Sequence, residues 1–258
     1  MGSRVDEREE ITVLVTGFGP FLDTAPVNPA WEIAKDLPAY LPPLNPKDPS
    51  ARQAFSSRPV RILVHPEAIR VNYQVVRALV PVFWEMYQGH RIDYTIHIGM
   101  AGAHPHYQIE RKGHRSGYVQ PDVDGLIPDL DRYSRGKDWV WYGLPEWLET
   151  DLDMPDLLSR WKANSPIGLD LRISDNAGRY LCEFIYYSSL SYLYKHQKER
   201  NVVFLHVPSD ASDIAVNRGR ELVLTLIRSL VESNEARSTR EGPREHKTVE
   251  NGPAEVPS

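Results

Sequence analysis

Apolar residues along the chain follow two spacings, which together predict strands that alternate with helices. Continuous apolar or β-branched runs predict buried strands at 11–16, 60–64, 93–98, 107–111, 169–173 and 201–207. Apolar residues at helical spacing predict helices at 28–37, 72–87, 154–163, 178–195 and 214–233. Such an alternation is typical of a mostly parallel sheet with helices on both faces, so the chain is expected to adopt an α/β fold.

Four segments depart from this pattern. Residues 38–59 contain six prolines and little periodicity, which predicts an irregular surface insertion. Residues 119–166 contain four of the six tryptophans, and so many large rings predict an ordered excursion, because disordered segments are poor in aromatics. The charged segments 1–10 and 234–258 are expected to be disordered, which leaves 11–233 as a single domain.

Composition excludes several classes of protein. The chain has 258 residues, and 30 Lys and Arg against 35 Asp and Glu give a formal net charge of −5, a poor match to a nucleic-acid binder. No apolar run approaches the roughly 20 residues that cross a bilayer. Charged residues stand where a secretory signal has its apolar stretch, which favours a cytoplasmic protein. With one cysteine, the chain can form neither an internal disulfide nor a cysteine-rich zinc site.

The loop after the first predicted strand, Gly17-Phe-Gly-Pro-Phe21, lacks the third glycine of a dinucleotide-binding fingerprint. Phe18 and Phe21 form either a flat apolar slot for a small ring or a plug at the end of the sheet. Asn28 precedes Pro29 and is expected to cap the next helix, although its amide could also bind a neutral polar ligand.

The only cysteine, Cys182, falls within the first two turns of the helix predicted at 178–195. The positive end of a helix stabilises a thiolate, which is the reactive form of cysteine. Its helical spacing with Leu181, Phe184 and Ile185 leaves the alternative that it is a core residue.

A cysteine nucleophile needs a base and an acid that orients it. His206 ends a nearly all-apolar strand and could lie beside Cys182. Glu110, in the loop region after the strand at 93–98, is the candidate acid.

The same region supports a rival hypothesis. His104, His106, Glu110 and His114 are suitable zinc ligands by residue type, so a zinc-dependent hydrolase is an alternative. Their spacing matches no helical zinc motif, and Pro105 disfavours a helix, so a solvated histidine-rich loop and a site without metal are preferred.

Six stretches in their order resemble the pyroglutamyl-peptidase I family of cysteine exopeptidases: 15–21, 27–31, 97–102, 109–118, 175–184 and 204–208. The resemblance implies a three-layer α/β/α sandwich, no cofactor, and peptides with an N-terminal pyroglutamyl residue as substrates. It implies that Cys182 attacks, His206 acts as acid and base, and Glu110 orients the imidazole. It also implies that Phe18 and Phe21 flank the pyroglutamyl ring, while Asn28 fixes the loop or binds the lactam.

The chain departs from many bacterial relatives at position 120, where Gln120 replaces an arginine associated with the oxyanion. Gln120, Arg115 or backbone N–H groups are the candidate replacements. The excursion at 119–166 could form a lid. A relative that binds pyroglutamyl termini without cleaving them is a further alternative, and whether the protein is a monomer or a homo-oligomer stays open.

Overall fold

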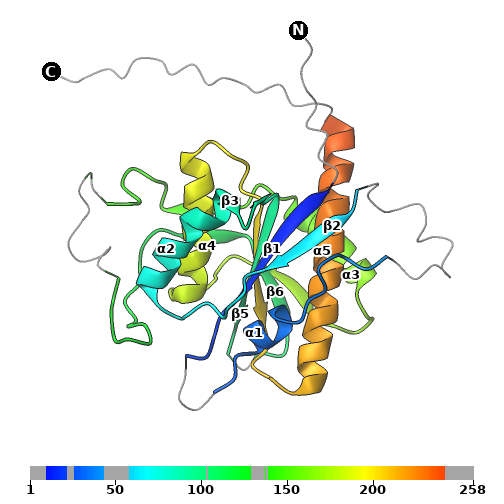
Figure 1. Ribbon diagram of the computed structural model, residues 1–258, viewed down its shortest axis with the longest axis horizontal. Helices are drawn as coiled ribbons and strands as arrows, with labels where there is room; N and C mark the ends of the chain where they lie inside the picture. The colour runs from blue at the N-terminus through cyan, green and yellow to red at the C-terminus, as the bar shows by residue number, and fades with distance from the viewer. Residues whose placement is uncertain are drawn as a thin grey trace, which may run out of the picture.

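Within the described residues, six strands form one mixed sheet that lies between two layers of helices (Figure 1). The computed structural model describes residues 10–21, 26–43, 58–102, 104–128, 137 and 139–241. The strand order is β2-β1-β5-β10-β6-β9. The strands are β1 (Ile11–Gly17), β2 (Val60–Val64), β5 (Tyr94–Met100), β6 (Tyr107–Glu110), β9 (Leu171–Ser174) and β10 (Val202–Val207).

The sheet is parallel except at one junction, where β6 pairs antiparallel with β10. Since β9 pairs parallel with β6, these two strands at one side of the sheet run opposite to the other four. The predicted α/β fold with a mostly parallel central sheet is confirmed.

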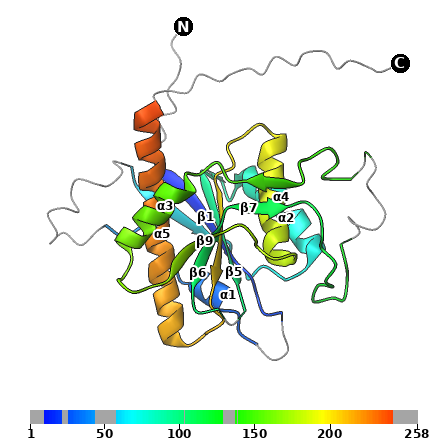
Figure 2. The same ribbon diagram turned by 180° about the vertical axis from the view of Figure 1, so that it is seen from behind.

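Helices cover both faces of the sheet, as the two opposite views in Figures 1 and 2 show. One face carries α1 (Pro29–Ala34), α3 (Met154–Asn164) and α5 (Asp213–Glu241), and the other carries α2 (Tyr73–Trp84) and α4 (Leu181–Lys195). Side chains alternate along a strand, so the core divides into two apolar clusters. On β10, Val203, Leu205 and Val207 pack with α5, whereas Phe204 packs with α4.

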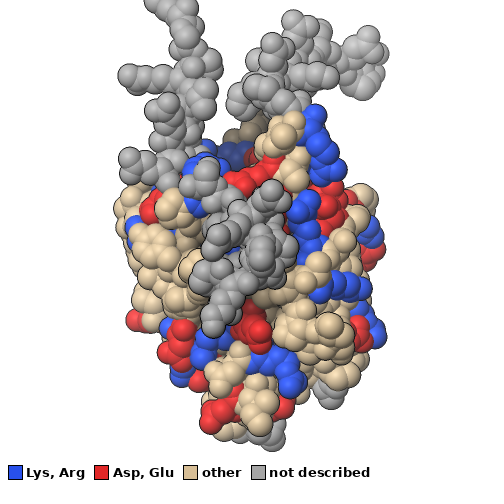
Figure 3. Space-filling model, turned by 90° about the vertical axis from the view of Figure 1, so that its right-hand side faces the viewer, with Lys and Arg blue, Asp and Glu red and all other residues tan. Residues whose placement is uncertain are grey.

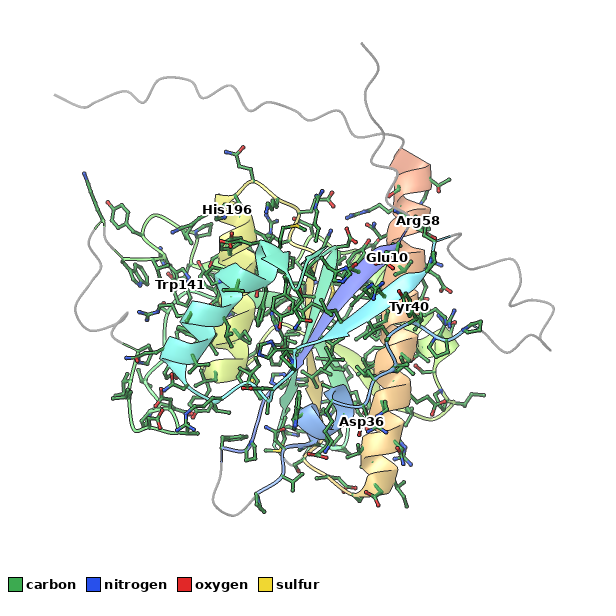
Figure 4. The ribbon with its side chains drawn as sticks, in the orientation of Figure 1. Glu10, Asp36, Tyr40, Arg58, Trp141 and His196 are labelled. Carbon is green, nitrogen blue, oxygen red and sulfur yellow. The ribbon has the colours of Figure 1, made fainter. Side chains whose placement is uncertain are left out.

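Among the described residues, two short antiparallel pairs of strands lie outside the main sheet. They are β3 (Met86–Tyr87) with β4 (His90–Arg91) and β7 (Lys112–His114) with β8 (Trp147–Glu149). The β7–β8 ladder anchors the tryptophan-rich segment against α4. Trp141, labelled in Figure 4, is buried and meets the ring of Tyr187 on α4 edge-on, with centroids 4.7 Å apart. Trp161 lies in the opposite layer, where its indole N–H donates to the Leu222 carbonyl at 3.0 Å.

The C-terminal helix is longer than predicted. We expected disorder from residue 234, but α5 continues to Glu241 and extends beyond the sheet (Figure 1). The prediction was wrong for 234–241 because composition does not reveal tertiary contacts: the Arg237 guanidinium donates to the Asp151 carbonyl at 2.6 Å. The rest of the predicted tail, residues 1–9 and residues 44–57 of the predicted insertion lie outside the described residues.

The outer surface gives two further observations. In the described part of the chain, no helix combines the length and apolar character needed to cross a membrane. On the face drawn in Figure 3, basic and acidic side chains lie intermingled over α5 and its surroundings, and neither sign of charge dominates.

Candidate active site

Strand alternation brings the two predicted partners of the cysteine to one face of the sheet. Because Leu205 and Ile109 belong to the cluster beneath α5, their neighbours His206 and Glu110 point to the opposite face, towards α4. In the antiparallel pair of β10 and β6, Glu110 lies opposite Phe204, so Glu110 and His206 are diagonal neighbours, close enough for their side chains to meet.

His206 and Glu110 form a buried ion pair. The imidazole Nδ1 lies 2.7 Å from Oε1 of Glu110, and both side chains are almost wholly removed from solvent. Burial lowers the pKa of His206, but hydrogen bonds and charges from Cys182 and Glu110 outweigh it and raise the pKa to about 9. The imidazole is therefore held as an imidazolium at neutral pH, with Nδ1 committed to the carboxylate.

Cys182 is the second residue of α4, so the prediction that it lies in the first turns of a helix is confirmed. The loop between β9 and α4 reverses direction at Gly178, whose φ of 87° suits glycine. The side chain of Cys182 is partly exposed, and its sulfur interacts with His206. Cys182 also packs against the apolar cluster beneath α4, so it lies at the boundary between that core and the solvent.

Gly99 on β5 is a site residue that the sequence pattern did not reveal. It lies opposite His206 in the parallel ladder and faces α4. A Cβ atom at Gly99 would come within 2.8 Å of Sγ of Cys182 and 2.7 Å of Cζ of Phe204. Only glycine leaves room for the sulfur over the sheet, and finding this required the register of β5 and β10.

A cavity of about 330 Å³ opens above Cys182 and His206. Phe18, Phe21 and Tyr180 contribute aromatic walls, and Asn28 and Gln108 contribute amides. Phe21 and Tyr180 lie with ring centroids 6.2 Å apart. The two phenylalanines thus line a cavity beside the cysteine, while Phe18 also packs into the core. Tyr180 and Gln108 were not among the predicted site residues.

Asn28 is buried at the edge of this cavity and makes two hydrogen bonds. Its Oδ1 accepts from the Ala30 N–H at 3.0 Å, which caps α1, and its Nδ2 donates to the Gly19 carbonyl at 2.8 Å. These bonds tie the loop that bears Phe18 and Phe21 to the start of α1.

The two predicted side-chain candidates for stabilising an oxyanion lie elsewhere. Gln120 is exposed, and neither it nor Arg115 lines the cavity. The Arg115 guanidinium binds the Leu144 carbonyl and Glu146 and lies over the ring of Trp139. Arg115 therefore supports the tryptophan-rich segment.

The four candidate zinc ligands are not brought together. Glu110 is paired with His206, and His114 is bonded through Nδ1 to Glu183 at 2.7 Å. His104 and His106 lie close to each other, with ring centroids 5.2 Å apart. Among the residues that the structure describes, no group of three or more histidine, cysteine or acidic side chains could hold a metal ion.

The sequence matches a known family. A family model described as pyroglutamyl peptidase matches residues 82–228. Human pyroglutamyl-peptidase 1 is 32% identical over 204 residues, which cover 78% of this chain and 81% of the human protein. A pyrrolidone-carboxylate peptidase of Bacillus mycoides is 28% identical over 199 residues, with 76% and 78% covered.

Solved structures share the fold. The pyrrolidone carboxyl peptidase from Thermococcus litoralis aligns with a TM-score of 0.65 at 18% identity, covering 88% of this chain and 96% of that one. Pyroglutamyl peptidase I of Bacillus amyloliquefaciens gives a TM-score of 0.64 at 21% identity, with 88% and 98% covered.

Proposed function

This chain belongs to the pyroglutamyl peptidase family and is a hydrolase, and from that premise we propose that it is a cysteine exopeptidase that removes N-terminal pyroglutamyl residues from peptides. The single observation that carries the proposal is the convergence of Cys182, His206 and Glu110 beneath a cavity with aromatic walls. The three side chains come from α4, β10 and β6, and each has the partner that nucleophilic catalysis requires.

The reaction follows from this arrangement. The Cys182 thiolate attacks the pyroglutamyl carbonyl carbon, and the C–N bond to the next residue breaks. The His206 imidazolium gives its Nε2 proton to the leaving amine, because Nδ1 is occupied by Glu110. Water then attacks the resulting thioester while His206 takes a proton from it. Pyroglutamate leaves as the free acid, and the thiolate and imidazolium are restored.

Backbone N–H groups at the start of α4 are the proposed donors to the oxyanion. Side chains cap α1, α2 and α3, namely Asn28, Asn72 and Asp153, whereas α4 begins at Tyr180 without a side-chain cap. The N–H groups of the first turn have no partner within the helix and can therefore donate hydrogen bonds to a developing negative charge beside the sulfur. One donor of this kind contributes about 3 kcal/mol to transition-state stabilisation, so backbone groups can replace the side chain absent at position 120.

The cavity also suits the proposed substrate. A pyroglutamyl ring is flat and neutral, and it has no ammonium group for an acidic pocket to bind. Phe18, Phe21 and Tyr180 supply apolar contact for its faces, which favours such a ring over a charged terminus. We assign Asn28 to fixing the loop, because its amide already bonds the Ala30 N–H and the Gly19 carbonyl.

A cytoplasmic location is part of the proposal. A lone thiol has no other cysteine in its chain to form a reversible disulfide with, so oxidation of Cys182 stops the reaction. Activity should therefore require reducing conditions.

The test is turnover of a fluorogenic pyroglutamyl amide, with the corresponding alanyl amide as a substrate control. Wild type should cleave only the former, iodoacetamide should abolish cleavage, and EDTA should leave it intact. Cys182→Ala should be inactive while it still binds pyroglutamate. Inhibition by EDTA without inhibition by iodoacetamide would support a zinc hydrolase, and wild-type binding without turnover would support a non-catalytic binding protein.

A further inference from the structure

Gln108 makes a contact with the catalytic carboxylate that the proposed triad does not include. It lies opposite His206 in the β10–β6 pair, and its side chain points to the same face as Glu110, two residues along β6. Its Nε2 donates to Oε1 of Glu110 at 2.8 Å. Oε1 therefore accepts two hydrogen bonds, one from Gln108 and one from His206.

The two hydrogen bonds at Oε1 matter because the other carboxylate oxygen, Oε2, has none within the described part of the chain. Oε2 of Glu110 is buried and has no hydrogen-bond partner among the described residues. A buried oxygen without a partner is costly, so the placement of this carboxylate depends on the donors at Oε1. His206 supplies one of these donors and Gln108 the other.

The orientation of the Gln108 amide is itself determined. A carboxylate only accepts hydrogen bonds when ionised, so the amide must present its NH₂ group to Glu110. Its Oε1 then faces His106, whose Nε2 lies 3.0 Å away. His106 acts as donor in this bond and prevents the amide from flipping, which would place two acceptors against each other.

We propose that Gln108 is a positioning residue of the active site, which holds the Glu110 carboxylate in place so that His206 stays bonded to it beside Cys182. The inference rests on the proposed triad and adds a fourth side chain to it. Gln108 also lines the cavity, so its side chain lies between the cavity and the buried carboxylate that its NH₂ group contacts.

The other titratable groups around Glu110 are accounted for. His206 faces it from β10, and α4 contributes Cys182 and Tyr186, whose hydroxyl donates to the Glu110 carbonyl at 2.8 Å. On the β9 side Glu110 lies opposite Ser174, and the next residue, Asp175, is paired with Arg111. Gln108 is thus the neutral donor whose removal changes the carboxylate without removing a charge.

The experiment measures the rate of iodoacetamide alkylation of Cys182 against pH, which requires no turnover and reports on the only thiol in the chain. Gln108→Met preserves the volume of the side chain and removes the donor. Loss of a hydrogen bond to the ionised carboxylate should shift the alkylation midpoint upward by about 1 pH unit. Turnover of the pyroglutamyl amide at pH 6 should fall about 10-fold in kcat with KM within about twofold, because the aromatic walls of the cavity remain.

Gln74→Met is the matched control, since Gln74 is exposed on α2 and does not line the cavity, and its profile should equal that of wild type. Gln108→Val, a residue suited to a strand, repeats the test with a second side chain. Unchanged midpoints in both Gln108 variants, or a change in the alkylation rate that is the same at every pH, would overturn the inference. A shifted midpoint in a protein that never cleaves the amide would retain the positioning role and refute the proposed function.

Discussion

Gly99 and Cys182 lie in direct apposition, with the sulfur of Cys182 above the α carbon of Gly99 on β5. A Cβ at position 99 would stand 2.8 Å from Sγ, a distance that real contacts do not tolerate. The nucleophile therefore occupies space that a neighbouring strand leaves empty, and its position is defined by the sheet as much as by α4.

Gly99→Ala should accordingly impair both catalysis and stability. The added methyl must displace Cys182 or Phe204, and a shift of about 1 Å at the nucleophile lowers kcat about 100-fold. Overpacking of this kind also lowers the free energy of unfolding by about 1–3 kcal/mol. Steady-state kinetics and urea unfolding measure the two effects. Gly113→Ala is the comparison, because Gly113 does not line the cavity and its Cβ would meet nothing closer than 3.2 Å, and equal losses in both variants would contradict the argument.

The ion pair of His206 and Glu110 predicts a dependence of stability on pH. The pKa of His206 is raised from about 6.5 in the unfolded chain to about 9 in the folded one. A raised pKa stabilises the fold fully below about pH 6.5, and this contribution disappears as the pH rises through about 9. Urea unfolding should therefore show that the stability advantage of wild type over Glu110→Gln shrinks between pH 6 and pH 9.5, by the part of this contribution that comes from Glu110 and not from Cys182. A constant difference across this range would mean that the imidazole is neutral.

Asn28 and Asn72 allow a matched comparison of two helix caps. Each accepts a hydrogen bond from the first turn of its helix, α1 or α2, but only Asn28 lines the cavity. Each alanine variant should lose about 1 kcal/mol of stability for the cap. Asn28→Ala should also raise KM for the pyroglutamyl amide, since the phenylalanine loop loses its bond at the Gly19 carbonyl. An increase in KM of the same size in Asn72→Ala would show that stability alone is responsible.

Arg115 should affect stability without affecting catalysis. Its guanidinium bonds the Leu144 carbonyl and Glu146, so Arg115→Ala should lower the free energy of unfolding by about 1–2 kcal/mol. Turnover at saturating substrate should change by less than about twofold, as it should in Gln120→Ala. A large fall in kcat in either variant would restore that residue as an oxyanion donor.

The sequence pattern predicted the elements of the fold better than their directions. β-Branched runs and helical spacing identified each of the six sheet strands and the five helices within a few residues at most ends. The direction of β6, which runs antiparallel to β10, could not be inferred. The apolar alternation of Tyr107 to Glu110 is the same in either direction. The last turns of α5 were missed because a long-range bond from Arg237 to the Asp151 carbonyl supports a polar segment.

In the candidate site, too, the sequence indicated some residues and only the structure revealed the others. Residue chemistry and the family resemblance pointed to Cys182, His206 and Glu110, since few residue types can act as nucleophile, base and orienting acid. The sequence did not indicate Gly99 and Gln108, because their importance depends on how β5 and β6 pair with β10. This pairing places Gly99 under the sulfur and Gln108 opposite His206. Arg115 suited an oxyanion by charge, but its surroundings on the tryptophan-rich segment are visible only in three dimensions.

The place of β10 in the sheet determines when the proposed triad can form. It is the last strand along the chain, yet it lies in the interior of the sheet, between β5 and β6. A chain emerging from the ribosome exposes the nucleophile and the carboxylate before the strand that carries the base. Until β10 inserts, the two parts of the sheet cannot join and the thiol has no imidazole beside it. Completion of the sheet and assembly of the proposed triad are thus a single late event.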